Sequence, residues 1–198
     1  MRNISSLFCL LLFITSSAIH ADTILLLHGY LGSSYEWQRS GIVGQLDSAD
    51  WQNAGVLVLK KERVFSSKEL NSDNYNHMRR FYSLELASEQ PIEQQAGQLD
   101  QYVKYVRYHH PEEQIILIGH SAGGVVARFY MVKNPSEDLG ALVTIASPHL
   151  GTKNAEYAQS ISENLLVWVD RIPGVEKLYR SQGLYFDLIP GRTDNLIA

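Results

Sequence analysis

Four short, largely apolar runs alternate along the chain with longer stretches of helical periodicity. The runs are residues 23–27, 56–59, 115–118 and 141–146. A run that is apolar at nearly every position is typical of a strand buried on both faces of a parallel sheet. Between the runs, apolar spacings of three and four predict helices over residues 91–108 and 125–131. We therefore predict an α/β domain with a mainly parallel sheet flanked by helices and a ligand site at the carboxyl ends of the strands.

Two other stretches are less regular. Residues 60–88 mix charged, Asn and aromatic side chains, which favours a long surface excursion with one short strand or helix near residues 79–86. Residues 154–172 carry apolar side chains at helical spacing, which predicts an amphipathic helix. Such a helix either covers the sheet or forms a lid over an apolar pocket.

Composition limits the classes of partner. The chain has 198 residues, 45% hydrophobic and 19% charged, which suits one domain with a packed core. Its 17 Lys and Arg against 21 Asp and Glu give a formal charge of −4. This acidic balance argues against nucleic acid, or an anionic membrane surface, as the main partner.

Residues 1–21 have the pattern of a secretory signal peptide. Arg2 gives a positive start, an apolar run follows from Ile4 to Ile14, and small residues lead to Ala21. The run is too short for a membrane-spanning helix, which needs about 20 apolar residues. We expect cleavage near Ala18 or Ala21, export to the periplasm or the cell exterior, and a mature domain over residues 22–198. The sole cysteine, Cys9, leaves with the signal, which excludes disulfides, cysteine nucleophiles and thiolate metal sites in the mature chain.

The strongest chemical signal is Gly119-His120-Ser121-Ala122-Gly123, between the third predicted strand and a predicted helix. A serine on a sharp strand-to-helix turn has crowded backbone on both sides, and glycines two residues before and after it remove the side chains that would clash. The helix that begins at Ala122 supplies a free N–H and a positive dipole end for a developing oxyanion. This context predicts a nucleophilic Ser121, and the alternative is a glycine-rich turn with an ordinary serine.

The first predicted strand ends in His28-Gly29-Tyr30-Leu31-Gly32. A tight loop at that place can offer a second oxyanion donor, for which the N–H of Tyr30 is our candidate, together with the N–H of Ala122. We expect His28 to shape this loop rather than to transfer protons.

With these two motifs in place, the chain resembles an α/β-hydrolase of the lipase and esterase kind over residues 23–190. His120 before the nucleophile, residues 123–124 and 127–128 after it, and residues 147–152 after the fourth strand resemble segments of triacylglycerol lipases and of GPI inositol-deacylase-like hydrolases. Residues 187–191 resemble the segment after the helical cap of that family. The resemblance implies hydrolysis of lipid or other acyl esters without a cofactor, and a transient contact with a lipid interface. It also implies a core that lacks the family's first and last strands.

The rest of a catalytic triad is not evident. A nucleophilic serine needs a histidine base oriented by a carboxylate, in this fold in the chain order Ser, acid, His. The only histidine after Ser121 is His149, and Asp138 with His149 would satisfy that order, although Asp138 falls in a helix-to-strand connection at the opposite edge of the sheet. The favoured expectation is that the chain stops before the strands that carry acid and base, and that it is nearly inactive.

Two other functions fit the same residues. The first is an inactive fragment or binding module that keeps the fold without the base. The second is an acyl transferase, which uses the same nucleophile but excludes water from the acyl-enzyme. A metal site is not expected, because His109-His110 lack clustered carboxylates and close a predicted helix, where a positive charge would favour the helix dipole.

Overall fold

The protein is built on a six-stranded sheet with the strand order β3-β2-β4-β1-β5-β6. The computed structural model describes residues 22–68, 79–165, 177 and 180–192. The strands are β1 (Asp22–Leu27), β2 (Gln52–Lys60), β3 (Arg63–Ser66), β4 (Arg80–Glu85), β5 (Gln114–His120) and β6 (Leu139–Ile145). Only the β2–β3 pair is antiparallel; every other neighbouring pair of the described sheet is parallel. The predicted fold class is confirmed.

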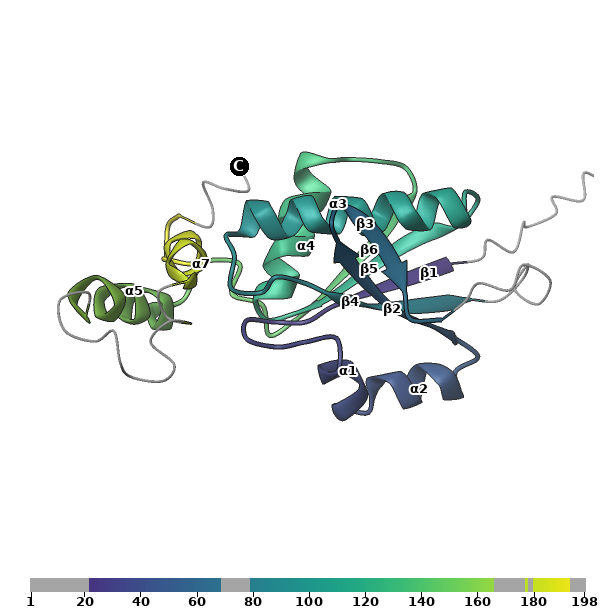
Figure 1. Ribbon diagram of the computed structural model, residues 1–198, viewed down its shortest axis with the longest axis horizontal. Helices are drawn as coiled ribbons and strands as arrows, with labels where there is room; N and C mark the ends of the chain where they lie inside the picture. Colours follow the sequence, from purple (N-terminus) through teal and green to yellow (C-terminus); the bar gives the residue numbers. More distant parts are fainter. Residues whose placement is uncertain (1–21, 69–78, 166–176, 178–179, 193–198) are drawn as a thin grey trace, which may run out of the picture.

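Helices cover both faces of this sheet. Figure 1 shows α3 (Ile92–His109) and α4 (Ala122–Lys133) on one face and α1 (Glu36–Arg39) with α2 (Ile42–Ser48) on the other. On β1, Leu25 and Leu27 belong to the core under α3 and α4, whereas Ile24 and Leu26 pack with Trp37 on the opposite face. Because β1 is buried on both faces, apolar side chains are required at every one of these positions.

The strand β4 corrects the prediction of a surface excursion. Residues 79–86 do contain a strand, but β4 lies between β2 and β1 at the centre of the sheet, and its side chains are buried from Arg80 to Leu84. Arg80 is buried because its guanidinium lies 2.7 Å from the Glu113 carboxylate, which also accepts a hydrogen bond from the Thr23 hydroxyl. Because a charged residue of a buried ion pair stands at the start of this strand, the strand lacks the continuous apolar run that identifies a buried strand in the sequence.

The antiparallel pair closes through a tight turn at Lys61-Glu62. Both residues have positive φ, 47° and 64°, as the central residues of a type I′ turn do. Neither is the Asn or Gly that usually marks such a turn, so the sequence carried no hairpin signal there. The hairpin extends the second predicted strand to residues 52–60 and adds β3 at the edge of the sheet.

Two helices lie beyond the carboxyl ends of the strands. Figure 1 shows α5 (Lys153–Leu165) and α7 (Gln182–Asp187) side by side there, and α5 contacts α7 rather than the faces of the sheet. The helix predicted over residues 154–172 is confirmed as far as Leu165, and its remainder lies outside the described residues. In its described part this helix packs on α7, and Ala155 is buried in the same core cluster as the strands. No helix in the described ranges is long and apolar enough to cross a bilayer.

Candidate functional site

Ser121 lies at the turn between β5 and α4 with an unusual backbone conformation. Its φ is 52° and its ψ is −128°, a region that residues with a side chain rarely adopt and that costs about 1–3 kcal/mol. The turn is held by hydrogen bonds from the Ser121 N–H to the carbonyl of Ile145 at 2.9 Å and from the Gly124 N–H to the carbonyl of Ser121 at 3.1 Å. A strained residue at the carboxyl end of a central strand is the geometry of a nucleophile elbow.

The glycines around Ser121 are required by close packing. A Cβ on Gly119 would lie 2.5 Å from the Gly124 Cα, and one on Gly123 would lie 2.3 Å from the carbonyl oxygen of His28. A Cβ on Gly124 would lie 2.0 Å from the hydroxyl of Ser147. Real Cβ atoms do not approach other atoms so closely. Glycines at these positions therefore allow α4 to begin directly against β1 and against the loop after β6.

The loop after β1 lies against the serine. A Cβ on Gly29 would be 2.9 Å from the Ser121 Cβ, so the Gly29 backbone packs directly against the Ser121 side chain. Residues 29–32 form a turn closed by the Gly32 N–H and the Gly29 carbonyl at 3.0 Å, with Leu31 at a φ of 54°. Among the described residues, neither the Tyr30 N–H nor the Ala122 N–H donates to a backbone or side-chain acceptor. Both N–H groups therefore lack a protein acceptor in the described part of the chain, and their role as oxyanion donors stays a prediction.

His28 makes backbone contacts from both ring nitrogens and is only 1% exposed. Its Nε2 accepts the Leu86 N–H at 3.1 Å, and its Nδ1 lies 3.0 Å from the Gly29 carbonyl oxygen. Because Nε2 accepts a hydrogen bond, Nδ1 is the ring nitrogen that donates. The imidazole therefore joins the loop after β1 to the end of β4, and neither contact is with Ser121.

His149 and Asp138 are not brought together. The Nε2 of His149 lies 3.1 Å from the Thr144 hydroxyl, and burial together with the charge of Arg128 lowers its pKa. Asp138 pairs with Arg107 just before β6, at the amino end of that strand. Ser121 follows the carboxyl end of the parallel strand β5, and strands of this length place the two ends about 20 Å apart. Asp138 cannot orient a base for Ser121.

The histidines at the end of α3 also lie away from Ser121. His110 Nε2 lies 3.0 Å from the Tyr82 hydroxyl, and burial, with Arg80 beside the ring, lowers its pKa to about 4. His110 is therefore neutral, and the predicted favourable charge at the helix end is wrong for this residue. Within the described ranges, no hydrogen bond joins the Ser121 hydroxyl to a histidine.

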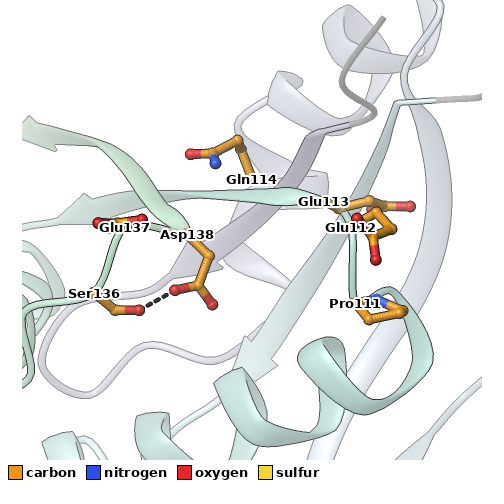
Figure 2. A pocket seen from close by; sticks show the side chains of 7 residues that line it. All are labelled: Pro111, Glu112, Glu113, Gln114, Ser136, Glu137 and Asp138. Carbon is orange, nitrogen blue, oxygen red and sulfur yellow. Dashed lines mark hydrogen bonds between the residues drawn. The ribbon is translucent and has the colours of Figure 1, made fainter. Parts of the chain in front are cut away.

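A cavity of about 460 Å³ lies at the opposite end of the sheet, lined by residues 111–114 and 136–138 (Figure 2). Its walls include four carboxylates, but Glu113 pairs with Arg80, and Asp138 pairs with Arg107 and accepts from the Ser136 hydroxyl. In the described part of the chain, no three His, Cys, Asp or Glu side chains are grouped to hold a metal ion. This cavity is distant from Ser121 and provides no chemistry for it.

Residues 18–166, most of the chain, match the model of one protein family, the PGAP1-like alpha/beta domain. A 71-residue stretch is 35% identical to triacylglycerol lipase 2 of Saccharomyces cerevisiae, covering 35% of this chain and 22% of the lipase. This chain therefore matches only about a fifth of the length of that curated relative.

Solved structures with the same fold include hydrolases. The Bacillus licheniformis lipase BlEst2 in its propeptide form superposes with a TM-score of 0.58 at 15% identity, covering 90% of this chain and 32% of the lipase. The product of the gene lin2722 of Listeria innocua gives a TM-score of 0.56 at 16% identity over 87% of this chain and 67% of that one. Phospholipase PlaB of Legionella pneumophila gives 0.53 at 14% identity, covering 89% and 35% of the two chains. At these identities the likeness shows the fold alone.

Proposed function

The chain belongs to the PGAP1-like alpha/beta domain family, and from that membership we propose that it is a serine hydrolase acting on carboxylic esters. The observation that carries this proposal is the strained Ser121, which precedes Ala122 and packs against Gly29, the residue before Tyr30. Among the described residues, the N–H groups of Tyr30 and Ala122 have no acceptor. Strain of this kind persists where the surrounding structure imposes it, and it presents the hydroxyl at the edge of the sheet where ligands bind in this fold class.

In the proposed reaction the Ser121 Oγ attacks the acyl carbonyl and transfers its proton to a base. The carbonyl electrons move onto oxygen, and the N–H groups of Tyr30 and Ala122 stabilise the resulting oxyanion together with the positive end of the α4 dipole. The alcohol leaves with a proton, and water then releases the acid from the acyl-enzyme. Among the described residues, no histidine forms a hydrogen bond with the Ser121 hydroxyl.

We propose lipid-like acyl esters as the substrate class. Leu31, on the turn beside Ser121, is 52% exposed, and Leu150, in the loop after β6, is 71% exposed. Exposed leucines on the loops at the carboxyl ends of the strands favour an apolar acyl chain and a transient contact with a lipid surface. The 71-residue similarity to triacylglycerol lipase 2 supports the same class.

We also propose that residues 1–21 direct export and are removed, which leaves a mature domain from residue 22. N-terminal sequencing of the exported protein tests this. A new terminus near Ala21 or Asp22 is expected, and a retained Met1 would contradict cleavage.

The second candidate function is a binding module without catalysis. The observation that favours it is the lack of a base beside Ser121 among the described residues, since loss of a triad member leaves only about a 1,000- to 10,000-fold rate enhancement over water. Hydrolysis of p-nitrophenyl butyrate by the 198-residue chain separates the two. We expect slow turnover that Ser121→Ala abolishes and Ser48→Ala, a change on α2 far from the elbow, preserves.

Two results of this assay would change the proposal. Equal turnover by the wild type and Ser121→Ala would contradict the assignment of the nucleophile. Fast turnover that collapses in His149→Ala would mean that His149 serves as base in a rearranged site. Adding an alcohol as a competing acceptor and measuring the new ester separates hydrolysis from acyl transfer.

A further inference from the structure

The short helix α7 is fixed against the amino end of α3. Ser181 and Leu184 are fully buried, and a Cβ on Gly183 would lie 2.6 Å from the ring of Pro91. The Asp187 carboxylate accepts the N–H of Ile92 at 2.8 Å, which satisfies one of the free donors at the start of α3. Two independent contacts therefore hold α7 in one position relative to the sheet.

The residues after α7 are tied to the loop that follows β6. The N–H of Thr152 donates to the Leu188 carbonyl at 2.8 Å. Gly151 has a φ of 83°, and a Cβ there would lie 2.6 Å from the Pro190 Cα. This loop follows β6, and the Ile145 carbonyl at the end of β6 accepts the Ser121 N–H. The end of α7 is therefore connected, through this loop, to the turn that holds Ser121.

α7 reaches the proposed oxyanion loop through one pair of side chains. The hydroxyls of Tyr185, on α7, and Tyr30 form a hydrogen bond, and the two rings pack edge to face with centroids 5.4 Å apart at 74°. Tyr185 is only 7% exposed. Burial and the Tyr30 hydroxyl raise the Tyr185 pKa, and one of the two hydroxyls donates to the other.

The Tyr30 side chain adds a further hold on this turn. The peptide that carries the Tyr30 N–H is held at its carbonyl, which accepts the Gly32 N–H at 3.0 Å and lies 3.0 Å from the His28 Nδ1. On the other side of Tyr30 the chain passes through Leu31, a residue at positive φ. Fixing the Tyr30 ring therefore holds the turn on the Cα side of the Tyr30 N–H.

We propose that Tyr185 is a positioning residue for the oxyanion loop, which it holds through Tyr30 so that the Tyr30 N–H faces the carbonyl oxygen of the substrate. This inference rests on the proposed function. Tyr185 touches neither the substrate nor the reacting atoms. It acts only through the side chain of the residue whose backbone does.

The test compares the wild type with Tyr185→Phe in the full chain. A p-nitrophenyl alkylphosphonate modifies activated serines, and its rate depends on the oxyanion donors. We expect the maximal rate of Ser121 modification to fall about five- to tenfold, the loss of one neutral hydrogen bond. The probe concentration that gives half of that rate should stay the same, because binding does not use the hydroxyl pair. Tyr157→Phe, at a 72% exposed tyrosine on α5, is the matched control and should behave as the wild type.

Amide hydrogen exchange gives a second readout that does not need chemistry. In Tyr185→Phe, exchange at the Gly32 N–H should rise about five- to tenfold, whereas the Ile92 and Thr152 N–H groups, which bind α7, should be unchanged. Tyr30→Phe removes the same bond from the other side. Its effect should equal that of Tyr185→Phe, and the double variant should add nothing further.

Each outcome decides one question. Modification of the wild type with an unchanged rate in Tyr185→Phe would overturn the inference and leave the proposed function intact. Faster exchange at Ile92 and Thr152 as well would mean that Tyr185 merely holds α7 in place, which also overturns it. If the wild type is not modified at all, the proposed function fails, and exchange at Gly32 alone decides whether Tyr185 orders the loop.

Discussion

Replacing Ser121 by glycine should stabilise the fold relative to replacing it by alanine. At a φ of 52° and a ψ of −128° a side chain costs about 1–3 kcal/mol, which alanine retains and glycine releases. Glycine loses about 0.5–1 kcal/mol through the greater freedom of the unfolded chain. Ser121 makes no side-chain cap bond to α4, so both variants lose the same hydroxyl without a capping penalty. The expected difference is about 1 kcal/mol in favour of glycine.

Urea denaturation followed by circular dichroism measures this difference. The matched control is Gln94, an exposed residue of α3, where glycine should be less stable than alanine by about 1 kcal/mol because the backbone is helical. The two sites should therefore respond with opposite signs. A Ser121→Gly variant that is no more stable than Ser121→Ala would refute the claim that the elbow is strained.

Two further predictions concern the packing around the elbow and the amino end of the sheet. Gly124→Ala should lower the free energy of unfolding by about 1–3 kcal/mol, because the new Cβ would lie 2.0 Å from the Ser147 hydroxyl; an unchanged melting temperature would contradict this packing. His110 has a folded pKa of about 4, below its usual value, so its contribution to stability is complete above pH 6.5 and is lost as the pH falls from 6.5 towards 4. Urea titrations across that range should show a shallower loss for His110→Gln than for the wild type, and equal slopes would mean that His110 does not remain neutral.

The sequence predicted those strands and helices whose buried positions are occupied by apolar residues at regular spacing. The strand β1 is buried on both faces and was found from its uninterrupted run of leucines. The strand β4 is equally buried, yet Arg80 stands at its start because Glu113 neutralises its charge from the loop before β5. A partner so distant along the chain gives no local signal, and the strand was therefore placed at the surface.

One part of the candidate site could be predicted from the sequence, and another part could not. Ser121 and its flanking glycines were found because a sharp turn imposes those residue types at fixed spacing, a local requirement. The contact of Tyr30 with Tyr185 spans 155 positions and depends on where α7 docks. Nothing in the residues around either tyrosine indicates that contact, so only the structure could connect α7 to the oxyanion loop.

The most direct test of the central claim, that Ser121 is the nucleophile of a serine hydrolase, is to locate the covalent adduct of a fluorophosphonate probe by peptide mapping. The account predicts a slowly formed adduct on Ser121, absent in Ser121→Ala and retained in Ser48→Ala. An adduct at another residue, or no adduct on the wild type under conditions that modify a known serine esterase, would contradict it.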